Sequence, residues 1–123
     1  MTLTALAYAP PPASAAAFCA SKISASTYYQ HDFSYGGSVV ATICSPGYNA
    51  AGNAYLYARG SYANVKKTMS LSVQKVGGST VSVSGSYYSY AYVYAPSGAH
   101  NYHAVMYNGS GTRIVNGNSS DYE

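Results

Sequence analysis

The sequence predicts an all-β protein, a single antiparallel β-sandwich or small barrel of about seven or eight short strands with an extended Pro-rich N-terminal arm. Three observations predict this class. No long window has the 3.6-residue period of an amphipathic helix. Apolar and polar residues alternate in several short segments, and Gly or Pro residues separate these segments at intervals of roughly ten residues. A length of 123 residues corresponds to one domain, which we place at residues 18–118.

Turn-forming residues bound several of the expected strands. In Thr68–Val76, for example, Met69, Leu71 and Val73 alternate with polar residues, and Gly77-Gly78 then predicts a tight hairpin turn. The expected strands are Ile23–Tyr29, Ser38–Cys44, Asn53–Arg59, Thr68–Val76, Thr80–Ser86, Tyr87–Ala95, Tyr102–Asn108 and Thr112–Asn116.

The two ends of the chain are expected to lie outside the sandwich. Within residues 1–17, Pro10-Pro11-Pro12 favours an extended spacer, while Ala13-Ser14-Ala15 matches a signal-peptide cleavage site. Two interpretations therefore stay open: a signal-peptide remnant, or a mature arm that donates a strand to a neighbouring subunit. The only helix-like stretch is the short run Ala13–Ala20. The polar tail, residues 119–123, is expected to be frayed.

Charge is scarce in this chain, at 7% of residues against roughly 25% in an average protein. The formal net charge is +3, and the six cations are dispersed except for the pair Lys66-Lys67. Binding of nucleic acid needs a clustered basic stripe, so we expect no nucleic-acid partner. No run approaches about 18 apolar residues, so we expect no membrane span. A surface that uses Ser, Thr, Asn and Tyr in place of charge favours a secreted, extracellular protein, or a subunit that buries its surface against copies of itself.

The two cysteines, Cys19 and Cys44, are predicted to form a disulfide, because the composition favours export. The bridge would close a loop of roughly 26 residues and contribute about 3.5 kcal/mol by the loss of chain entropy in the unfolded state. The alternative is a pair of buried thiols.

Residues suited to catalysis are few. Asp32 is the only acid in the body of the predicted fold, so the carboxylate pair of a glycosidase is lacking. Its neighbour His31 would point to the opposite face of a strand, which disfavours a Ser-His-Asp triad. His31, His100 and His103 could bind a metal together, although three surface imidazoles is the more ordinary interpretation. We therefore expect no enzymatic activity, no cofactor and no metal site.

Tyrosine is the most abundant side chain with binding potential: the chain has sixteen Tyr and no Trp. Alternation predicts that four of them share one face of the strand Tyr87–Ala95, opposite small residues. Tyr offers a flat apolar ring and a hydroxyl at low entropic cost, which suits contacts with proteins and stacking on sugars. The alternative is ordinary cross-strand packing within a sheet. The predicted contact residues are Tyr88, Tyr90, Tyr92, Tyr94, Tyr55 and Tyr57.

Two tripeptides, Asn108-Gly109-Ser110 and Asn118-Ser119-Ser120, match the acceptor pattern for N-glycosylation. A chain rich in Asn and Ser also produces such triplets by chance.

The stretch from Cys44-Ser-Pro-Gly-Tyr48 to Asn53-Ala-Tyr-Leu-Tyr57 resembles a family of small secreted actinobacterial proteins typified by spore-associated protein A. The Tyr-rich segment 87–94 is similar to a later strand of that family, and the likeness covers residues 44–110. The family's additional cysteines are missing from segments 64–66 and 99–102 here. Lactococcin-like secreted proteins are a more distant likeness. The resemblance implies a β-sandwich exported to the cell surface and assigns no catalytic residue.

The leading hypothesis is a secreted, non-enzymatic protein that acts by contact through a Tyr-rich β surface. Its role would be that of a cell-surface-associated or adaptor subunit in an extracellular assembly, with a protein or copies of itself as the partner. The alternatives are a carbohydrate-binding module with a glycan as partner, and a secreted antimicrobial, bacteriocin-like protein.

Overall fold

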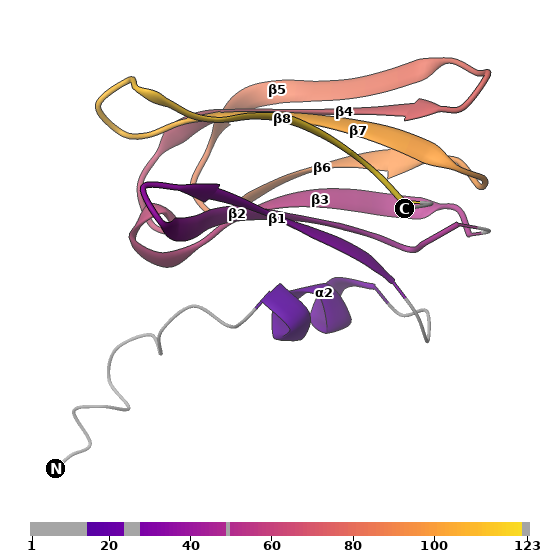
Figure 1. Cartoon of the computed structure of the whole chain (residues 1–123), viewed down its shortest axis with the longest axis horizontal. Coiled ribbons are helices and arrows are strands. Elements are labelled where there is room, and N and C mark those ends of the chain that lie inside the picture. The colour runs from indigo at the N-terminus through magenta and orange to yellow at the C-terminus, as the bar shows by residue number, and fades with distance from the viewer. Residues whose placement is uncertain (1–14, 24–27, 49, 122–123) are drawn as a thin grey trace, which may run out of the picture.

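A computed structural model describes residues 15–23, 28–48 and 50–121, and in them two four-stranded antiparallel sheets pack face to face (Figure 1). The predicted all-β sandwich is confirmed. The elements are α2 (Ala15–Lys22), β1 (Tyr29–Tyr35), β2 (Ser38–Ser45), β3 (Gly52–Ala58), the short 3₁₀ helix η1 (Gly60–Tyr62), β4 (Lys67–Lys75), β5 (Thr80–Tyr87), β6 (Tyr90–Ala95), β7 (His100–Tyr107) and β8 (Arg113–Ser120).

The strand order is β1-β2-β3-β6 in the first sheet and β5-β4-β7-β8 in the second. After the β4–β5 hairpin the chain crosses to the first sheet to form β6, and then returns to the second sheet with β7. Strands β1 and β6 are therefore the edges of the first sheet. Helix α2 lies on the side of the first sheet that faces away from the second, as Figure 1 shows.

Alternation along each strand sends small and aliphatic side chains into the space between the sheets. From the first sheet, Ile43 and Leu56 enter this core, and from the second, Leu71 and Met106 meet them. The core is therefore formed by the apolar side of each alternating strand, and it contains few aromatic residues. Its buried members are Val40, Ala41, Ile43, Ala54, Leu56, Ala58, Met69, Leu71, Val73, Ala91, Ala95, Tyr102, Ala104, Met106, Ile114 and Val115.

The first strand differs from the expected one. We expected Ile23–Tyr29 to be extended, but β1 spans Tyr29–Tyr35, and Ile23 instead packs at the end of α2. Residues 24–27 lie outside the described part of the chain. The segment Gln30-His31-Asp32 is polar because β1 is an edge strand with one face turned to solvent, a position where hydrophobic alternation is weak.

The expectation of a frayed tail is wrong for residues 119–121. Strand β8 pairs with β7 as far as Ser120, which lies opposite Asn101, and Ser119 and Ser120 are both buried. The next residue, Asp121, is held by hydrogen bonds to His100. A run of Asn, Gly and Ser has low strand propensity, and here pairing with β7 overrides that propensity.

The helix begins within the segment that we assigned to the arm. Helix α2 spans Ala15–Lys22, two residues beyond the expected Ala-rich run at its C-terminal end. The predictions for residues 1–14, a spacer with a cleavage site or a donated strand, fall outside the described residues, as do residues 122–123. None of the helices in the described part has the length and apolar character needed to cross a membrane.

Candidate functional site

The outer face of the first sheet is lined by tyrosines from two neighbouring strands. The register of β3 with β6 places Tyr55 opposite Tyr92 and Tyr57 opposite Tyr90. Side chains directly opposite each other in an antiparallel pair lie close enough to touch. We call Tyr55, Tyr57, Tyr90, Tyr92 and Tyr94 together the outer tyrosine face.

The prediction that Tyr88, Tyr90, Tyr92 and Tyr94 share one face of one strand is wrong for Tyr88. Tyr87 ends β5 in the second sheet, and Tyr88 lies in the connection through which the chain crosses to the first sheet. The crossing is held at Ser89, whose carbonyl accepts a hydrogen bond of 2.8 Å from the amide of Ala58. Alternation therefore restarts at Tyr90, and β6 carries three tyrosines on one face.

Helix α2 covers half of the outer tyrosine face. The ring of Phe18 stacks on that of Tyr57, with the centroids 3.7 Å apart, and meets Tyr55 edge-on at 6.0 Å. The predicted disulfide between Cys19 and Cys44 is present and ties the helix to β2. Only 9% of Tyr55 and 6% of Tyr57 remain exposed. These two predicted contact residues are therefore part of a small second core, with Phe18, Cys19, Ile23 and Cys44.

The uncovered part of the face is formed by Tyr92 and Tyr94, which are 54% and 61% exposed. Tyr88, in the nearby connection, is 58% exposed. Tyr90 is half-buried beneath α2, where the ammonium of Lys22 lies 4.6 Å from its ring centroid and donates a hydrogen bond of 3.2 Å to its hydroxyl. Of the four tyrosines predicted for one strand, Tyr88, Tyr92 and Tyr94 are available to a partner and Tyr90 is partly covered.

Ring contacts connect the covered part of the face to the exposed part. Tyr92 lies 5.9 Å from Tyr55 and 6.3 Å from Tyr90, measured between ring centroids. Both neighbours are in turn in contact with Phe18. The exposed ring of Tyr92 is thus supported from behind by fixed rings, which lowers the entropy that it would lose on binding.

A small hollow borders the same face. It has a volume of about 180 Å³ and lies where the end of α2 approaches the loop before β3. Lys22 and Asn53 supply polar groups to its lining, which Tyr55 also joins. Since Asn53 lies opposite Tyr94 in the sheet, the hollow reaches the strand position beside this exposed tyrosine.

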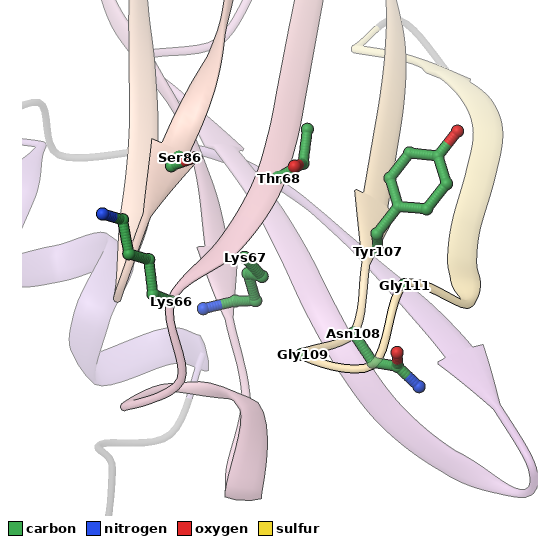
Figure 2. A pocket seen from close by; sticks show the side chains of 8 residues that line it. All are labelled: Lys66, Lys67, Thr68, Ser86, Tyr107, Asn108, Gly109 and Gly111. Atoms are coloured by element: carbon green, nitrogen blue, oxygen red, sulfur yellow. The ribbon is translucent and has the colours of Figure 1, made fainter.

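A larger hollow of about 440 Å³ lies at one end of the second sheet (Figure 2). Its most unusual residue is Lys67, a lysine that is only 3% exposed. The ammonium donates hydrogen bonds to the carbonyl oxygens of Val65 and Tyr88, and burial lowers the pKa of Lys67 to about 8. Lys67 thus holds the crossing between the sheets. The lining residues are Lys66, Lys67, Thr68, Ser86, Tyr107, Asn108, Gly109 and Gly111.

At the opposite end of β4 and β7, a buried polar chain joins the two sheets. The hydroxyl of Tyr102 donates to Ser45 Oγ at 2.7 Å and lies 3.4 Å from Asp121 Oδ2. Asp121 accepts hydrogen bonds from the backbone amide of His100 at 2.8 Å and from its Nδ1 at 3.0 Å. Burial raises the pKa of Tyr102 well above its usual range, and the hydrogen bond to Ser45 opposes this increase.

The expectation that His100 is a surface imidazole is therefore wrong, because only 1% of it is exposed. Its Nε2 is buried without a hydrogen-bond partner among the described residues. Asp121 accepts the hydrogen bond of Nδ1 and also lies within reach of the Tyr102 hydroxyl. Within the described residues no serine hydroxyl is hydrogen-bonded to Nε2, as the base of a Ser-His-Asp triad requires. The sequence did not predict this set of hydrogen bonds, because its carboxylate belongs to Asp121, in the segment 119–123 that we expected to be frayed.

The other two histidines make local contacts. His31 packs edge-on against Phe33 with 4.9 Å between centroids, and His103 Nδ1 lies 2.7 Å from the amide oxygen of Asn118. No cluster of three or more His, Cys, Asp or Glu side chains suited to a metal ion occurs within residues 15–23, 28–48 and 50–121.

Comparison with protein-family models, with curated proteins and with solved structures finds no significant match for this chain. The resemblance to small secreted actinobacterial proteins therefore stays a prediction.

Proposed function

We propose that the protein is secreted and acts by contact, without catalysis, through the exposed part of its outer tyrosine face. The observation that carries the proposal is the pair Tyr92 and Tyr94, two large rings more than half exposed on an edge strand. Its expected role is that of a cell-surface-associated or adaptor subunit in an extracellular assembly, and its partner is another protein or a second copy of the chain.

The geometry of β6 supports contact with a protein surface. Its inward residues Ala91 and Ala95 are fully buried and anchor the strand, while its outward rings project toward solvent. Rings with a hydroxyl at the tip contribute apolar area at the centre of an interface and a hydrogen bond at its rim. Lys22, a charged side chain beside this face, is engaged with Tyr90.

Two properties support export. The disulfide between Cys19 and Cys44 is typical of proteins that fold in an oxidising compartment. The low charge content, 7% of residues, fits a surface that is solubilised by hydroxyl and amide groups. Neither property depends on the identity of the partner.

A second candidate function, glycan binding, is favoured by the hollow beside the face. Lys22 and Asn53 line this hollow together with Tyr55, and Asn53 lies opposite Tyr94 in the sheet register. A sugar ring stacked on an exposed tyrosine could receive hydrogen bonds from these two side chains. Lys22 and Asn53 offer this hollow hydrogen-bond donors for the hydroxyl groups of a short oligosaccharide.

The test compares the native chain with the double variant Tyr92→Ser/Tyr94→Ser by analytical ultracentrifugation over a wide concentration range. We expect the native chain to self-associate, or to bind a partner from its own culture medium, and the double variant to remain monomeric and unbound. Tyr35→Ser is the matched control, because Tyr35 is also exposed but lies at the end of β1, away from this face. Equal behaviour of the double variant and the native chain would contradict the proposal.

Glycan binding is separated from protein contact by a glycan array and by titration of the tyrosine fluorescence. Binding of a glycan that is lost in Asn53→Ala, while ultracentrifugation shows a monomer throughout, would favour the second candidate. Concentration-dependent mass that is insensitive to Asn53→Ala would favour contact between proteins.

A further inference from the structure

The tip of the β7–β8 hairpin contains a sequence with a reactivity of its own. The chain has two Asn-Gly pairs in these strands, Asn108-Gly109 at the tip and Asn116-Gly117 within β8. In an Asn-Gly pair the backbone nitrogen of glycine can attack the side-chain amide of asparagine, because no side chain on glycine shields that nitrogen. Whether the attack occurs depends on the conformation that the fold imposes.

The amide of Asn108 is held in an unusual way. Its Oδ1 accepts three hydrogen bonds, from the Ser110 amide at 3.0 Å, from the Ser110 hydroxyl at 2.8 Å and from the Thr112 amide at 2.9 Å. Three donors on one carbonyl oxygen draw electrons from the amide carbon, and they also stabilise the negative charge that would form on Oδ1 during an attack. The side chain is thus oriented and polarised by its own loop.

The attacking and leaving atoms are both accessible. The N–H of Gly109 makes no hydrogen bond to another described residue, so its nitrogen is not held by the sheet. Figure 2 shows the Asn108 amide nitrogen pointing away from the Lys66 and Lys67 side chains, and Asn108 is partly exposed. Water can therefore protonate the departing nitrogen.

We propose that Asn108 is a site of spontaneous deamidation in the folded protein. The Gly109 nitrogen loses its proton and forms a bond to Asn108 Cγ, the bond from Cγ to Nδ2 breaks, and ammonia leaves with that proton. The product is a succinimide. Water then opens the ring at Cγ to give aspartate, or at the backbone carbonyl to give isoaspartate. Nothing is oxidised or reduced, and water is the only co-reactant.

The second pair, Asn116-Gly117, is protected by the same fold. Asn116 lies opposite Val105 and Gly117 opposite Ala104 in the ladder of β7 with β8. Gly117 also packs so closely that a Cβ atom there would lie 2.9 Å from the ring of Phe33. Ring closure needs a rotation of the asparagine backbone, and this strand cannot make it without breaking its pairing.

Deamidation at Asn108 changes the protein in two ways. Either product carries a new carboxylate at the edge of the hollow, which lowers the formal net charge from +3 to +2. An aspartate can still accept the three hydrogen bonds of the turn. An isoaspartate adds a backbone atom and so displaces the hydrogen bonds that join Asn108 to Gly111 and Thr112. It also shifts Gly109, which packs on Val65.

The test is a time course of peptide mapping after incubation of the folded chain in mildly alkaline buffer. We expect Asn108 to deamidate at least about tenfold faster than Asn116, which corresponds to about 1.4 kcal/mol in activation free energy. In the reduced, urea-unfolded chain the two pairs should react at similar rates. Ion-exchange chromatography, with Asn108→Asp as the reference, should show the native peak converting to a species with one charge less.

A variant of Ser110 tests whether polarisation of the Asn108 amide, and not only exposure of the loop, speeds the reaction. Ser110→Ala removes one of the three donors and should slow the reaction at Asn108 by about two- to tenfold, whereas Ser97→Ala, in another exposed turn, should leave it unchanged. Hydrogen exchange of β7 and β8 verifies that the fold is intact in both. Equal native rates at Asn108 and Asn116, or a faster reaction in Ser110→Ala, would overturn the proposal.

Discussion

Phe18 lies parallel to Tyr57, with an angle of 2° between the ring planes. The helix that carries Phe18 is short, and its hydrogen bonds alone would not keep it folded. This stack, together with the adjacent disulfide of Cys19, keeps α2 on the sheet. The contact also decides which tyrosines of the outer face are buried and which remain available to a partner.

Phe18→Ala should destabilise the protein by about 3 kcal/mol, because it removes a buried aromatic ring and leaves a cavity over Tyr57. Urea unfolding followed by circular dichroism would measure the change. Tyr35→Ala, which truncates an exposed ring, should change the free energy of unfolding by less than about 0.5 kcal/mol. A loss below about 1 kcal/mol for Phe18→Ala would show that α2 contributes little to the fold.

The double variant Cys19→Ser/Cys44→Ser should lose about 3 kcal/mol, because the bridge spans a sequence separation of 25 residues. We also expect stronger binding of a hydrophobic dye, since release of α2 uncovers Tyr55 and Tyr57. Reduction of the native protein should reproduce both effects. An unchanged free energy of unfolding would be inconsistent with a structural role for this bridge.

The lowered pKa of Lys67 predicts that the free energy of unfolding rises with pH above neutrality. Its pKa is about 8 in the folded protein, against 10.5 for an exposed lysine in the unfolded chain. Between these values the unfolded state binds the proton and the folded state does not, so the free energy of unfolding should increase by up to about 1.4 kcal/mol per pH unit. Urea unfolding at a series of pH values from neutral to about 10 would measure the slope. In Lys67→Met the slope should disappear, although the variant is less stable at each pH because the carbonyls of Val65 and Tyr88 lose their donor.

The raised pKa of Tyr102 predicts that the free energy of unfolding falls at higher pH. An exposed tyrosine ionises near pH 10.0, whereas burial keeps Tyr102 protonated in the folded state above that pH. Above about pH 10 the folded state therefore binds more protons than the unfolded state, and the free energy of unfolding should fall. Together with Lys67, this places the maximum of stability on the alkaline side of neutrality.

The variant Tyr102→Phe isolates this effect. It removes the hydroxyl that donates to Ser45, so we expect a loss of about 1–3 kcal/mol near neutral pH and a weaker decline above about pH 10. Tyr107→Phe serves as the control, because Tyr107 is half-buried on the outer face of the same strand. If Tyr102→Phe matched the native protein at neutral pH, the polar chain would not hold the sheets together.

Much of the sandwich could be predicted from local pattern. Strand β4 is an example, because Met69, Leu71 and Val73 alternate with polar residues, and such a segment buries its apolar side only as a strand. The Gly77-Gly78 turn and the cysteine pair could be read in the same way. Strand β1 and the end of β8 could not, since edge strands with a solvated face show little hydrophobic alternation.

The candidate site depended on the tertiary structure. By itself the sequence determined that β6 would present alternating tyrosines and that Cys19 and Cys44 could pair, since both follow from periodicity and composition. Only the fold decided that the chain crosses between sheets at Tyr88, that α2 covers Tyr57 and that Asp121 reaches His100. These three outcomes depend on contacts between segments far apart in the chain, and the energies of such contacts are set by burial and packing, which local pattern does not contain.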